Sequence, residues 1–172
     1  GVTLKFRAVA ETCSGGARFG ISADDSFAGY WFNTTDSYWY PLGVKNGTAT
    51  PLVDIAAGKN RDQVYAIERG TNQLLVLNAK TLQWVRQGSE PLAQLSVRCS
   101  GSIWAVTAAG QLLRRSRSRR TWRVMGKDVK AVSAGRSVMV LDDNNRLYQY
   151  RAPRELGAPE GKEQWRDMNQ EL

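Results

Sequence analysis

An internal repeat of about 40 residues constrains this chain more than any other feature. Three segments follow one plan, Leu52–Trp84, Leu92–Trp122 and Val129–Tyr150. Each begins with an alternating apolar strand, passes through a turn containing Gly or Ser into a second strand, and then turns on Gly or Asn into a third. Self-similarity at this period is typical of folds that stack one small unit many times. The sequence therefore predicts consecutive antiparallel β-meanders.

Apolar residues and turns fall at equivalent positions in the three segments. The turns between the second and third strands are Arg69-Gly70, Ala109-Gly110 and Asp143-Asn144-Asn145, which carry residues that accept positive φ or close a tight hairpin. The equivalent apolar positions, at offsets of 35 to 40 residues, are Ile55, Leu95 and Val132 in the first strand, Val64, Ile103 and Val138 in the second, and Leu74, Leu112 and Leu147 in the third.

Tryptophan spacing extends the repeat to both ends of the chain. Trp39, Trp84, Trp122 and Trp165 are separated by 45, 38 and 43 residues, and each follows an expected third strand. We expect four units near residues 1–45, 46–88, 89–126 and 127–150, with 151–172 as a final strand or a polar tail. In the first unit, the expected strands are Leu4 to Ala10, Phe19 to Ser22, and Tyr30 to Phe32.

The fold class follows from the size of the unit. A meander of three or four strands cannot bury both of its faces alone, so neighbouring units must stack. The six Trp, six Tyr and 16 Gly, without a long Ala/Glu/Lys/Leu run, favour short strands over helices. We expect an all-β fold of β-propeller type with roughly four antiparallel blades. Since propellers have about four to eight blades, the ring either closes at its smallest size or is completed by oligomerisation or a partner.

One unit carries a family resemblance. The segment Ser96 to Arg115, SVRCSGSIWAVTAAGQLLRR, followed by Trp122-Arg123-Val124, resembles the tectonin repeat of tectonin- and tachylectin-like lectins. The neighbouring units match more loosely, so the resemblance covers about Leu52 to Tyr150. It implies a propeller that recognises glycans or lipopolysaccharide, often in innate immunity, or an interaction module inside cells. Gln63 to Leu77 also resembles an NHL-type blade, which implies a propeller as well.

The residue inventory argues against an enzyme. Without histidine, the chain lacks Ser-His-Asp and Cys-His arrangements and nearly all zinc-site patterns. Asp24-Asp25 and Asp142-Asp143 are adjacent pairs, and neighbours on a strand point to opposite faces, so we interpret them as turn residues. There is no phosphate-binding Gly-rich loop and no calcium-loop spacing. We expect a non-catalytic protein with no cofactor and no metal.

Basic residues suggest one candidate binding site. The formal net charge is +8, and the stretch from Leu112 to Lys127 is rich in arginine and has no acidic residue. It is interpreted as a solvated hairpin between a third and a fourth strand, or as an anion site, because guanidinium groups bind phosphate or sulfate through two hydrogen bonds. Nucleic acid is disfavoured, because no aromatic residues are interleaved to stack bases. The candidate arginines are Arg114, Arg115, Arg117, Arg119 and Arg120.

Aromatic residues suggest another. Trp31, Tyr38, Trp39 and Tyr40 lie within ten residues, more than strand alternation can bury, so part of this cluster is expected at a surface or partner interface. Trp84 and Trp122 are expected to pack between blades. Trp104 is expected in the core, although ligands of propeller lectins lie between blades where such a ring can be reached. Trp31, Trp39 and Trp104 are therefore candidate ligand-binding residues.

Several features bear on location. Cys13 and Cys99 form either one disulfide or two buried thiols, and Asn33 and Asn46 begin glycosylation sequons. No run of 18 apolar residues and no signal-peptide pattern is present, so no transmembrane segment is expected. An extracellular location is the prediction, with a cytoplasmic one as the alternative.

Two functions are open at this point. The first is recognition of a glycan or an anionic glycolipid. The alternative is a scaffold or subunit propeller that binds another protein chain or a second copy of itself, with nucleic acid bound through the arginine-rich stretch as a weaker option.

Overall fold

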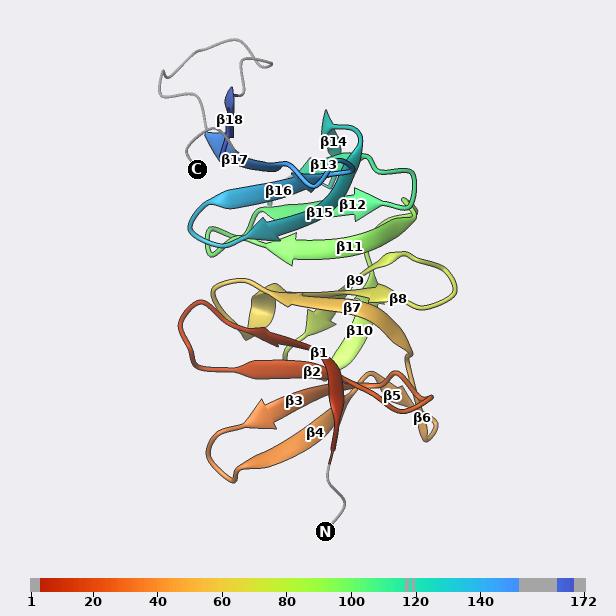
Figure 1. The fold of residues 1–172 in the computed structure, drawn as a ribbon. Coiled ribbons are helices and arrows are strands. Elements are labelled where there is room, and N and C mark those ends of the chain that lie inside the picture. Colours follow the sequence, from red (N-terminus) through yellow and green to blue (C-terminus); the bar gives the residue numbers. More distant parts are fainter. Residues whose placement is uncertain (1–3, 117, 119, 152–163, 169–172) are drawn as a thin grey trace.

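The predicted meanders form four separate four-stranded antiparallel sheets in the computed structural model, which describes residues 4–116, 118, 120–151 and 164–168. Each sheet is one propeller blade, and its strands follow one another in sequence order (Figure 1). The expectation of an all-β, propeller-type fold with four antiparallel blades is confirmed. Blade 1 is β1 (Phe6–Glu11), β2 (Arg18–Ser22), β3 (Gly29–Asn33) and β4 (Tyr38–Leu42); blade 2 is β7 (Leu52–Ala57), β8 (Val64–Glu68), β9 (Leu74–Asn78) and β10 (Gln83–Arg86).

The second half of the chain repeats this plan. Between blades 1 and 2 lie the short hairpin of β5 (Val44–Lys45) and β6 (Thr48–Ala49), and a 3-10 turn η1 (Arg61–Gln63) precedes β8. The last strand of blade 4 is Gln164–Asp167, within the segment expected to be a final strand or tail. Blade 3 is β11 (Leu92–Val97), β12 (Ile103–Thr107), β13 (Leu112–Arg115) and β14 (Arg123–Gly126); blade 4 is β15 (Val129–Ala134), β16 (Val138–Asp142), β17 (Leu147–Arg151) and β18 (Gln164–Asp167).

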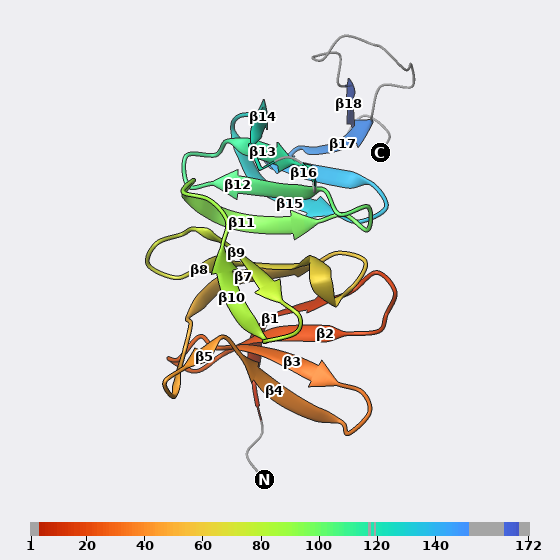
Figure 2. The ribbon, with the colours of Figure 1, turned by 180° about the vertical axis from the view of Figure 1, so that it is seen from behind.

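The blades stack in sequence order. The first strand of each blade packs against the first strand of the next, and blades 1 and 4 lie at opposite ends of the molecule (Figures 1 and 2). We call the sheet face turned toward the following blade the forward face, and the opposite one the rear face. Three apolar clusters fill the spaces between blades 1 and 2, 2 and 3, and 3 and 4. Burial between successive blades is therefore what stabilises the stack.

The backbone register is the same in every blade. Val64, Ile103 and Val138 pair with Ala57, Val97 and Ala134, the last residues of the three first strands. An irregularity also recurs near the start of each first strand, including that of blade 1. Such a bulge bends the strand locally. The N-terminal unit, which lies outside the three aligned segments, is thus a full blade of the same construction.

The four spaced tryptophans occupy one equivalent position, in the outermost strand or just before it. Trp84 packs on blade 1, Trp122 on blade 2, and Trp165 on blade 3. The prediction that Trp84 and Trp122 pack between blades is confirmed. Trp39 lies on the rear face of blade 1, where the ring of Phe6 packs against it in a tilted arrangement at a centroid distance of 4.4 Å.

Polar side chains join the first strands of neighbouring blades. The Leu95 N–H donates to Asp54 Oδ2 at 2.8 Å, and the Val132 N–H donates to Gln94 Oε1 at 2.9 Å. Asp54 and Gln94 hold equivalent positions, since they pair with Ile67 and Val106 in their own blades. Backbone N–H groups need a partner when buried, and the preceding blade supplies it here.

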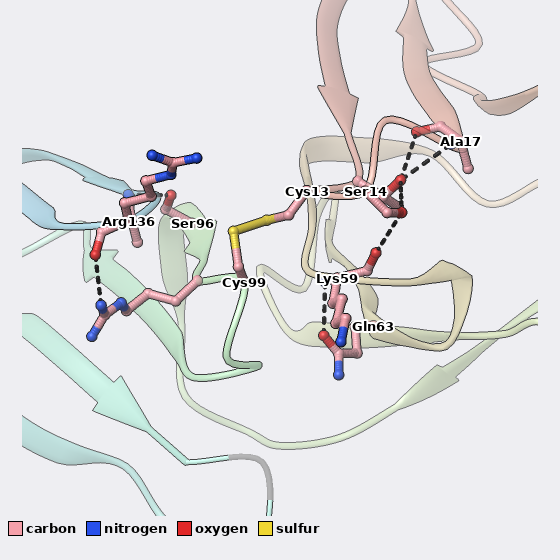
Figure 3. Close-up of a disulfide and its surroundings, with 11 residues drawn as sticks. Cys13, Ser14, Ala17, Lys59, Gln63, Ser96, Cys99 and Arg136 are labelled. Atoms are coloured by element: carbon pink, nitrogen blue, oxygen red, sulfur yellow. Dashed lines mark hydrogen bonds between the residues drawn. A yellow bond between two sulfur atoms is a disulfide. The ribbon is translucent and has the colours of Figure 1, made fainter.

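A disulfide joins blade 1 to blade 3. Cys13 lies in the loop between β1 and β2, Cys99 lies in the loop between β11 and β12, and their Cα atoms are 5.7 Å apart (Figure 3). Blade 2 reaches the same place, because the Cys13 N–H donates to the carbonyl of Gly58 at 2.9 Å and the Ser14 hydroxyl donates to the carbonyl of Lys59 at 3.0 Å. Loops of three consecutive blades are thus tied together along one side of the stack.

Within the described part of the chain, no helix has the length and apolar character required to cross a membrane.

Candidate functional site

The arginine-rich stretch does not form the predicted solvated loop at its start. Arg115 belongs to β13 and is only 4% exposed. Its Nη1 donates to the backbone carbonyl of Gln87 at 3.0 Å, and its Nη2 donates to Gln87 Oε1 at 2.9 Å. Burial lowers the pKa of its guanidinium. Arg115 therefore holds blade 3 to the end of blade 2, and its side chain is not exposed as that of a ligand-binding arginine would be.

Arg114, its neighbour on β13, points to the other face. Its Nη1 donates to the Tyr150 hydroxyl at 3.2 Å, and its guanidinium lies 5.5 Å from the centre of the Trp104 ring. It is half-buried and joins blade 3 to blade 4. Arg120 is exposed, whereas Arg117 and Arg119 lie outside the described residues. Two of the five candidate arginines thus serve blade packing.

Trp104 is not an accessible platform. Its side chain is fully buried, and its ring lies 5.1 Å from that of Tyr150 and 6.4 Å from that of Trp165. The second strand is covered by the next blade, so the expectation that Trp104 lies in the core is confirmed and its ring is not exposed to a ligand. Trp31 is half-buried, because the Arg61 guanidinium lies over its ring at 3.8 Å and the Tyr40 ring lies at 5.8 Å.

The aromatic cluster of blade 1 does form a surface site. Trp39 and Pro41 line a groove of about 570 Å³ together with Tyr30 of the neighbouring strand, and Tyr38, at 62% exposure, stands at its rim. We call this the aromatic groove; its lining is Leu4, Tyr30, Ser37, Tyr38, Trp39 and Pro41. The expectation that part of the cluster lies at a surface is confirmed. Trp39, one of the predicted ligand-binding residues, lines the groove.

A hydrogen-bonded turn holds one side of the aromatic groove. Asp36, between β3 and β4, accepts hydrogen bonds from the Tyr40 hydroxyl at 2.5 Å, the Tyr38 N–H at 3.1 Å and Asn33 Nδ2 at 3.2 Å. The bond to Asp36 raises the pKa of the Tyr40 phenol. An aromatic groove with a fixed rim offers stacking, apolar contact and phenolic hydrogen bonds. These three kinds of interaction are the ones by which aromatic binding sites hold a ligand or a partner.

A second hollow lies between blades 3 and 4. This cleft measures about 410 Å³; Leu112, Met125, Val129 and Val140 are its apolar lining, Tyr148 and Trp165 its aromatic residues, and Gly126, Lys127, Asp128, Asp142 and Asn144 complete it. Ligands were expected between blades in general terms, and neither Tyr148 nor Lys127 was a predicted site residue. The sequence feature that could have indicated these two residues is their place near a turn, since Lys127 directly follows β14 and Tyr148 is the second residue of β17.

The acidic pairs lie at turns, as interpreted from the sequence, with Asp142 as the last residue of β16. Asp142 Oδ1 accepts the N–H groups of Asn144 at 2.9 Å and Arg146 at 2.8 Å. Asp24 Oδ1 accepts from the Ser22 hydroxyl at 2.8 Å and from Ser26, and these bonds, led by that of Ser26, lower the pKa of Asp24. Both carboxylates are thus engaged in local turn structure.

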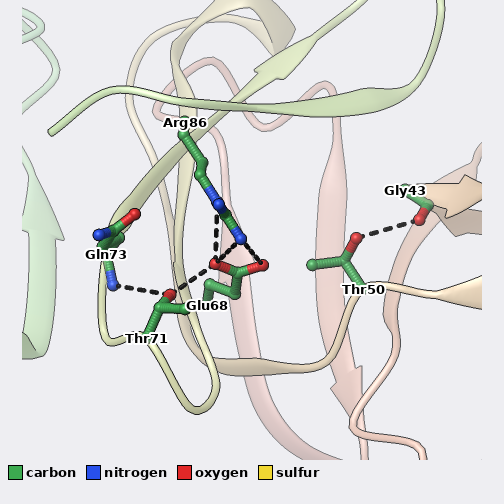
Figure 4. Close-up of polar contacts among 6 residues, drawn as sticks. All are labelled: Gly43, Thr50, Glu68, Thr71, Gln73 and Arg86. Carbon is green, nitrogen blue, oxygen red and sulfur yellow. Dashed lines mark hydrogen bonds and ion pairs between the residues drawn. The ribbon is translucent and has the colours of Figure 1, made fainter. Parts of the chain in front are cut away.

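A conspicuous ion pair on blade 2 is also structural. Arg86 donates from Nε to Glu68 Oε2 and from Nη2 to Glu68 Oε1, both at 3.1 Å, and the Thr71 hydroxyl donates to the same carboxylate (Figure 4). Burial raises the pKa of Glu68, but the hydrogen bonds from Arg86 and Thr71 outweigh it, so the pKa is lowered. The pair joins β10 to the end of β8.

The two sequon asparagines differ in environment. Asn46 is exposed at the tip of the β5–β6 hairpin, where its φ is 51°. Asn33 is half-buried, and its Oδ1 accepts the Thr35 N–H at 3.1 Å. Asn46 is therefore the more accessible of the two.

Comparison with known proteins supports the fold alone. No family model matches the chain, and no curated protein matches it significantly. Solved structures similar to it include U3-55K (TM-score 0.66, 12% identity) and YCF48 from Cyanidioschyzon merolae (TM-score 0.63, 10% identity). Prp20p from Saccharomyces cerevisiae is a third, with a TM-score of 0.60 and 11% identity.

These similarities extend over most of this chain but only part of the others. The matches cover 96%, 95% and 86% of this chain and 52%, 59% and 44% of U3-55K, YCF48 and Prp20p, respectively. The chain thus spans about half the length of the solved structures that it resembles.

Proposed function

We propose that this chain is a non-catalytic propeller module that binds another polypeptide at the aromatic groove of blade 1. The observation that carries the proposal is the groove itself, where Tyr30, Tyr38 and Trp39 are gathered beside Pro41 at the end of the stack. Tyrosine and tryptophan are enriched among the residues that dominate binding energy in protein interfaces. A groove of about 570 Å³ is large enough to take several side chains of a partner.

The similar solved structures lend this proposal general support. The Prp20p structure is described with its binding properties to Gsp1p and histones, and a further similar structure, with a TM-score of 0.64 and 13% identity, is of Dbp5 bound to Nup159 and Gle1. Propellers of this shape thus occur in protein complexes. The residues that would contact a partner are proposed from the groove and not from these structures.

A photo-crosslinking amino acid at position 38 tests the proposal. We expect it to join the protein covalently to a discrete polypeptide, because Tyr38 stands at the rim of the groove. The matched control carries the same group at Val124, which is 60% exposed on β14 and lies outside the groove. Equal labelling at both positions, or none at position 38, would refute the proposal.

A glycan in the cleft between blades 3 and 4 is the second candidate function. Tyr148 and Trp165 offer aromatic faces, and Lys127, Asp142 and Asn144 offer polar groups for hydroxyls. The resemblance to the tectonin repeat supports this reading. A glycan array tests it, with Asn144→Ala expected to lose any binding at least tenfold and Asn46→Ala, far along the chain, to retain it. Binding by neither form would leave this function without support.

We also propose that the protein functions outside the reducing cytosol. The support is the disulfide between Cys13 and Cys99 together with the exposed sequon at Asn46. Passage through a eukaryotic secretory pathway should add a glycan that is lost in Asn46→Gln and retained in an Asn60→Gln control, which has no sequon.

A further inference from the structure

We propose that the forward face of blade 4 binds the rear face of blade 1 in a second copy of this chain, so that two copies repeat between them the contact that successive blades make within the chain. The inference rests on the proposed function, because the rear face of blade 1 contains the aromatic groove, and it names the partner of that surface.

The rear face of blade 1 retains the residues that pack against a preceding blade elsewhere. Val9 pairs with Gly20 just as Ile55 pairs with Ala66 and Leu95 pairs with Ala105. Ile55 and Leu95 are each 5% exposed, whereas Val9 is 64% exposed. Trp39 likewise holds the position of Trp84, which packs on a preceding blade. This face is built for a contact that blade 1 does not make in the described chain.

The forward face of blade 4 is the matching surface. Leu141 pairs with Ala131 as Ile67 pairs with Asp54 and Val106 pairs with Gln94. Ile67 and Val106 are buried under the following blade, but Leu141 is only half-buried and Leu147, on the next strand, is 36% exposed. Apolar residues thus stand at the same positions in the second and third strands of blade 4 as in the blades that are covered.

A hydrogen-bonding position recurs as well. Ser96 and Ser133 are equivalent, since they pair with Trp104 and Met139. The Ser96 hydroxyl accepts the Ala134 N–H of the following blade at 2.8 Å. Glu11 holds the position of Ala134 in blade 1, so the exposed Ser133 hydroxyl would accept the N–H of Glu11 in the second copy.

The rear face of blade 1 differs from the covered rear face of blade 2 in having charged residues at its edge, as a surface that is exposed before two chains meet would have. Glu11 and Arg18 form an ion pair of 3.5 Å on the rear face of blade 1, at the positions where Ala57 pairs with Val64 in blade 2. Exposed charges keep a free face soluble, and an apolar centre with a polar rim is typical of interfaces between folded proteins. A contact between two different faces of identical chains is a heterologous interface, and such interfaces close into a ring when the rotation from one chain to the next allows it. Two copies would give eight blades, within the range of about four to eight seen in propellers.

Sedimentation equilibrium with two single variants tests the proposal. We expect the wild type to form a dimer, and we expect Val9→Glu and Leu141→Glu each to weaken that dimer at least tenfold, because each places a carboxylate in one of the two faces. Val124→Glu is the matched control, since Val124 is an exposed valine outside both faces and should leave the dimer unchanged. Circular dichroism establishes that each variant is folded.

Mixing the two variants gives the decisive result. The Val9→Glu chain keeps its forward face and the Leu141→Glu chain keeps its rear face, so an equimolar mixture should form a one-to-one heterodimer while neither variant dimerises alone. A wild type that remains monomeric up to about 100 μM overturns the inference, as does a mixture that stays monomeric when the wild type is dimeric. If the wild type is monomeric but position 38 crosslinks to another polypeptide, the proposed function stands and this inference alone fails.

Discussion

Arg115 on β13 is held by Gln87, which accepts one of its hydrogen bonds through the backbone carbonyl and a second through the side-chain amide oxygen, at 3.0 and 2.9 Å. Gln87 follows β10, the outermost strand of blade 2, so this contact fixes the edge of one blade to the body of the next. Arg115 is therefore a buried structural residue, although it belongs to the arginine-rich stretch.

Arg115→Lys should therefore destabilise the protein. A lysine cannot reproduce the two-pronged geometry of the guanidinium, so at least one acceptor of Gln87 loses its partner, at a cost of about 1–3 kcal/mol. Urea unfolding monitored by tryptophan fluorescence measures the change. Arg120→Lys, at an exposed position, should stay within roughly 0.5 kcal/mol of the wild type. Equal effects of the two substitutions would contradict the assignment of Arg115 to the core.

Removal of the disulfide should cost more. Cys13 and Cys99 are separated by 86 residues, and closing a loop of this length stabilises a folded chain by at most about 4–5 kcal/mol in the chain-entropy model. We expect the Cys13→Ser/Cys99→Ser double variant to unfold at a lower urea concentration than the oxidised wild type. A reductant should lower the midpoint of the wild type and leave that of the double variant unchanged. A wild type that is insensitive to reductant would show that the bond contributes nothing.

Asp54 should make stability depend on pH. Burial raises the pKa of this carboxyl from the model-peptide value of 3.8, against the opposing hydrogen bonds from the Leu95 and Ile55 N–H groups. Between the unfolded and the folded pKa the folded state holds more of the proton, so the contribution of Asp54 is full below pH 3.8 and is lost as the pH rises through the folded pKa.

The measurement is a difference between variants. The free energy of unfolding of the wild type minus that of Asp54→Ala should be largest in acid and should decrease as the pH is raised. Gln94→Ala is the control, because Gln94 holds the equivalent position and accepts the Val132 N–H without a charge. Its difference from the wild type should not vary with pH. A pH-independent difference for Asp54→Ala would show that the burial of its carboxylate has no cost.

Gly43→Ala should strain the contact between blades 1 and 2. A Cβ atom at Gly43 would lie 2.1 Å from Trp84 Cδ1, and the backbone there has a φ of 65°. We expect a loss of about 2–4 kcal/mol of stability, as both overpacking and the left-handed conformation are penalised. Gly47→Ala, with a φ of 79° and no atom within 4 Å of the new Cβ, isolates the backbone cost of about 1 kcal/mol. Thermal unfolding of both variants measures the difference, and equal losses would mean that Trp84 moves aside freely.

The sequence by itself determined the blade. Alternation of apolar residues, turn residues and the tryptophan spacing are local, so they predicted the first three strands of blades 2, 3 and 4 and the equivalent positions within them. They also predicted the strands of blade 1, whose match to the others is weak in sequence. The surplus of aromatics around Trp39 predicted an exposed site, because a strand can bury only alternate residues.

Only the tertiary structure decided what each conspicuous side chain does. Arg115 belongs to the core because the neighbouring blade covers it, and nothing in its own segment indicates which face the neighbour will cover. The disulfide between Cys13 and Cys99 depends on loops of blades 1 and 3 meeting along one side of the stack. Val9 and Val132 have the same place in their blades, yet one is exposed and the other buried, because Val132 packs against a preceding blade and Val9, in the first blade, does not. A repeat fixes the local plan of each unit, whereas the surface available for binding is set by how the units stack.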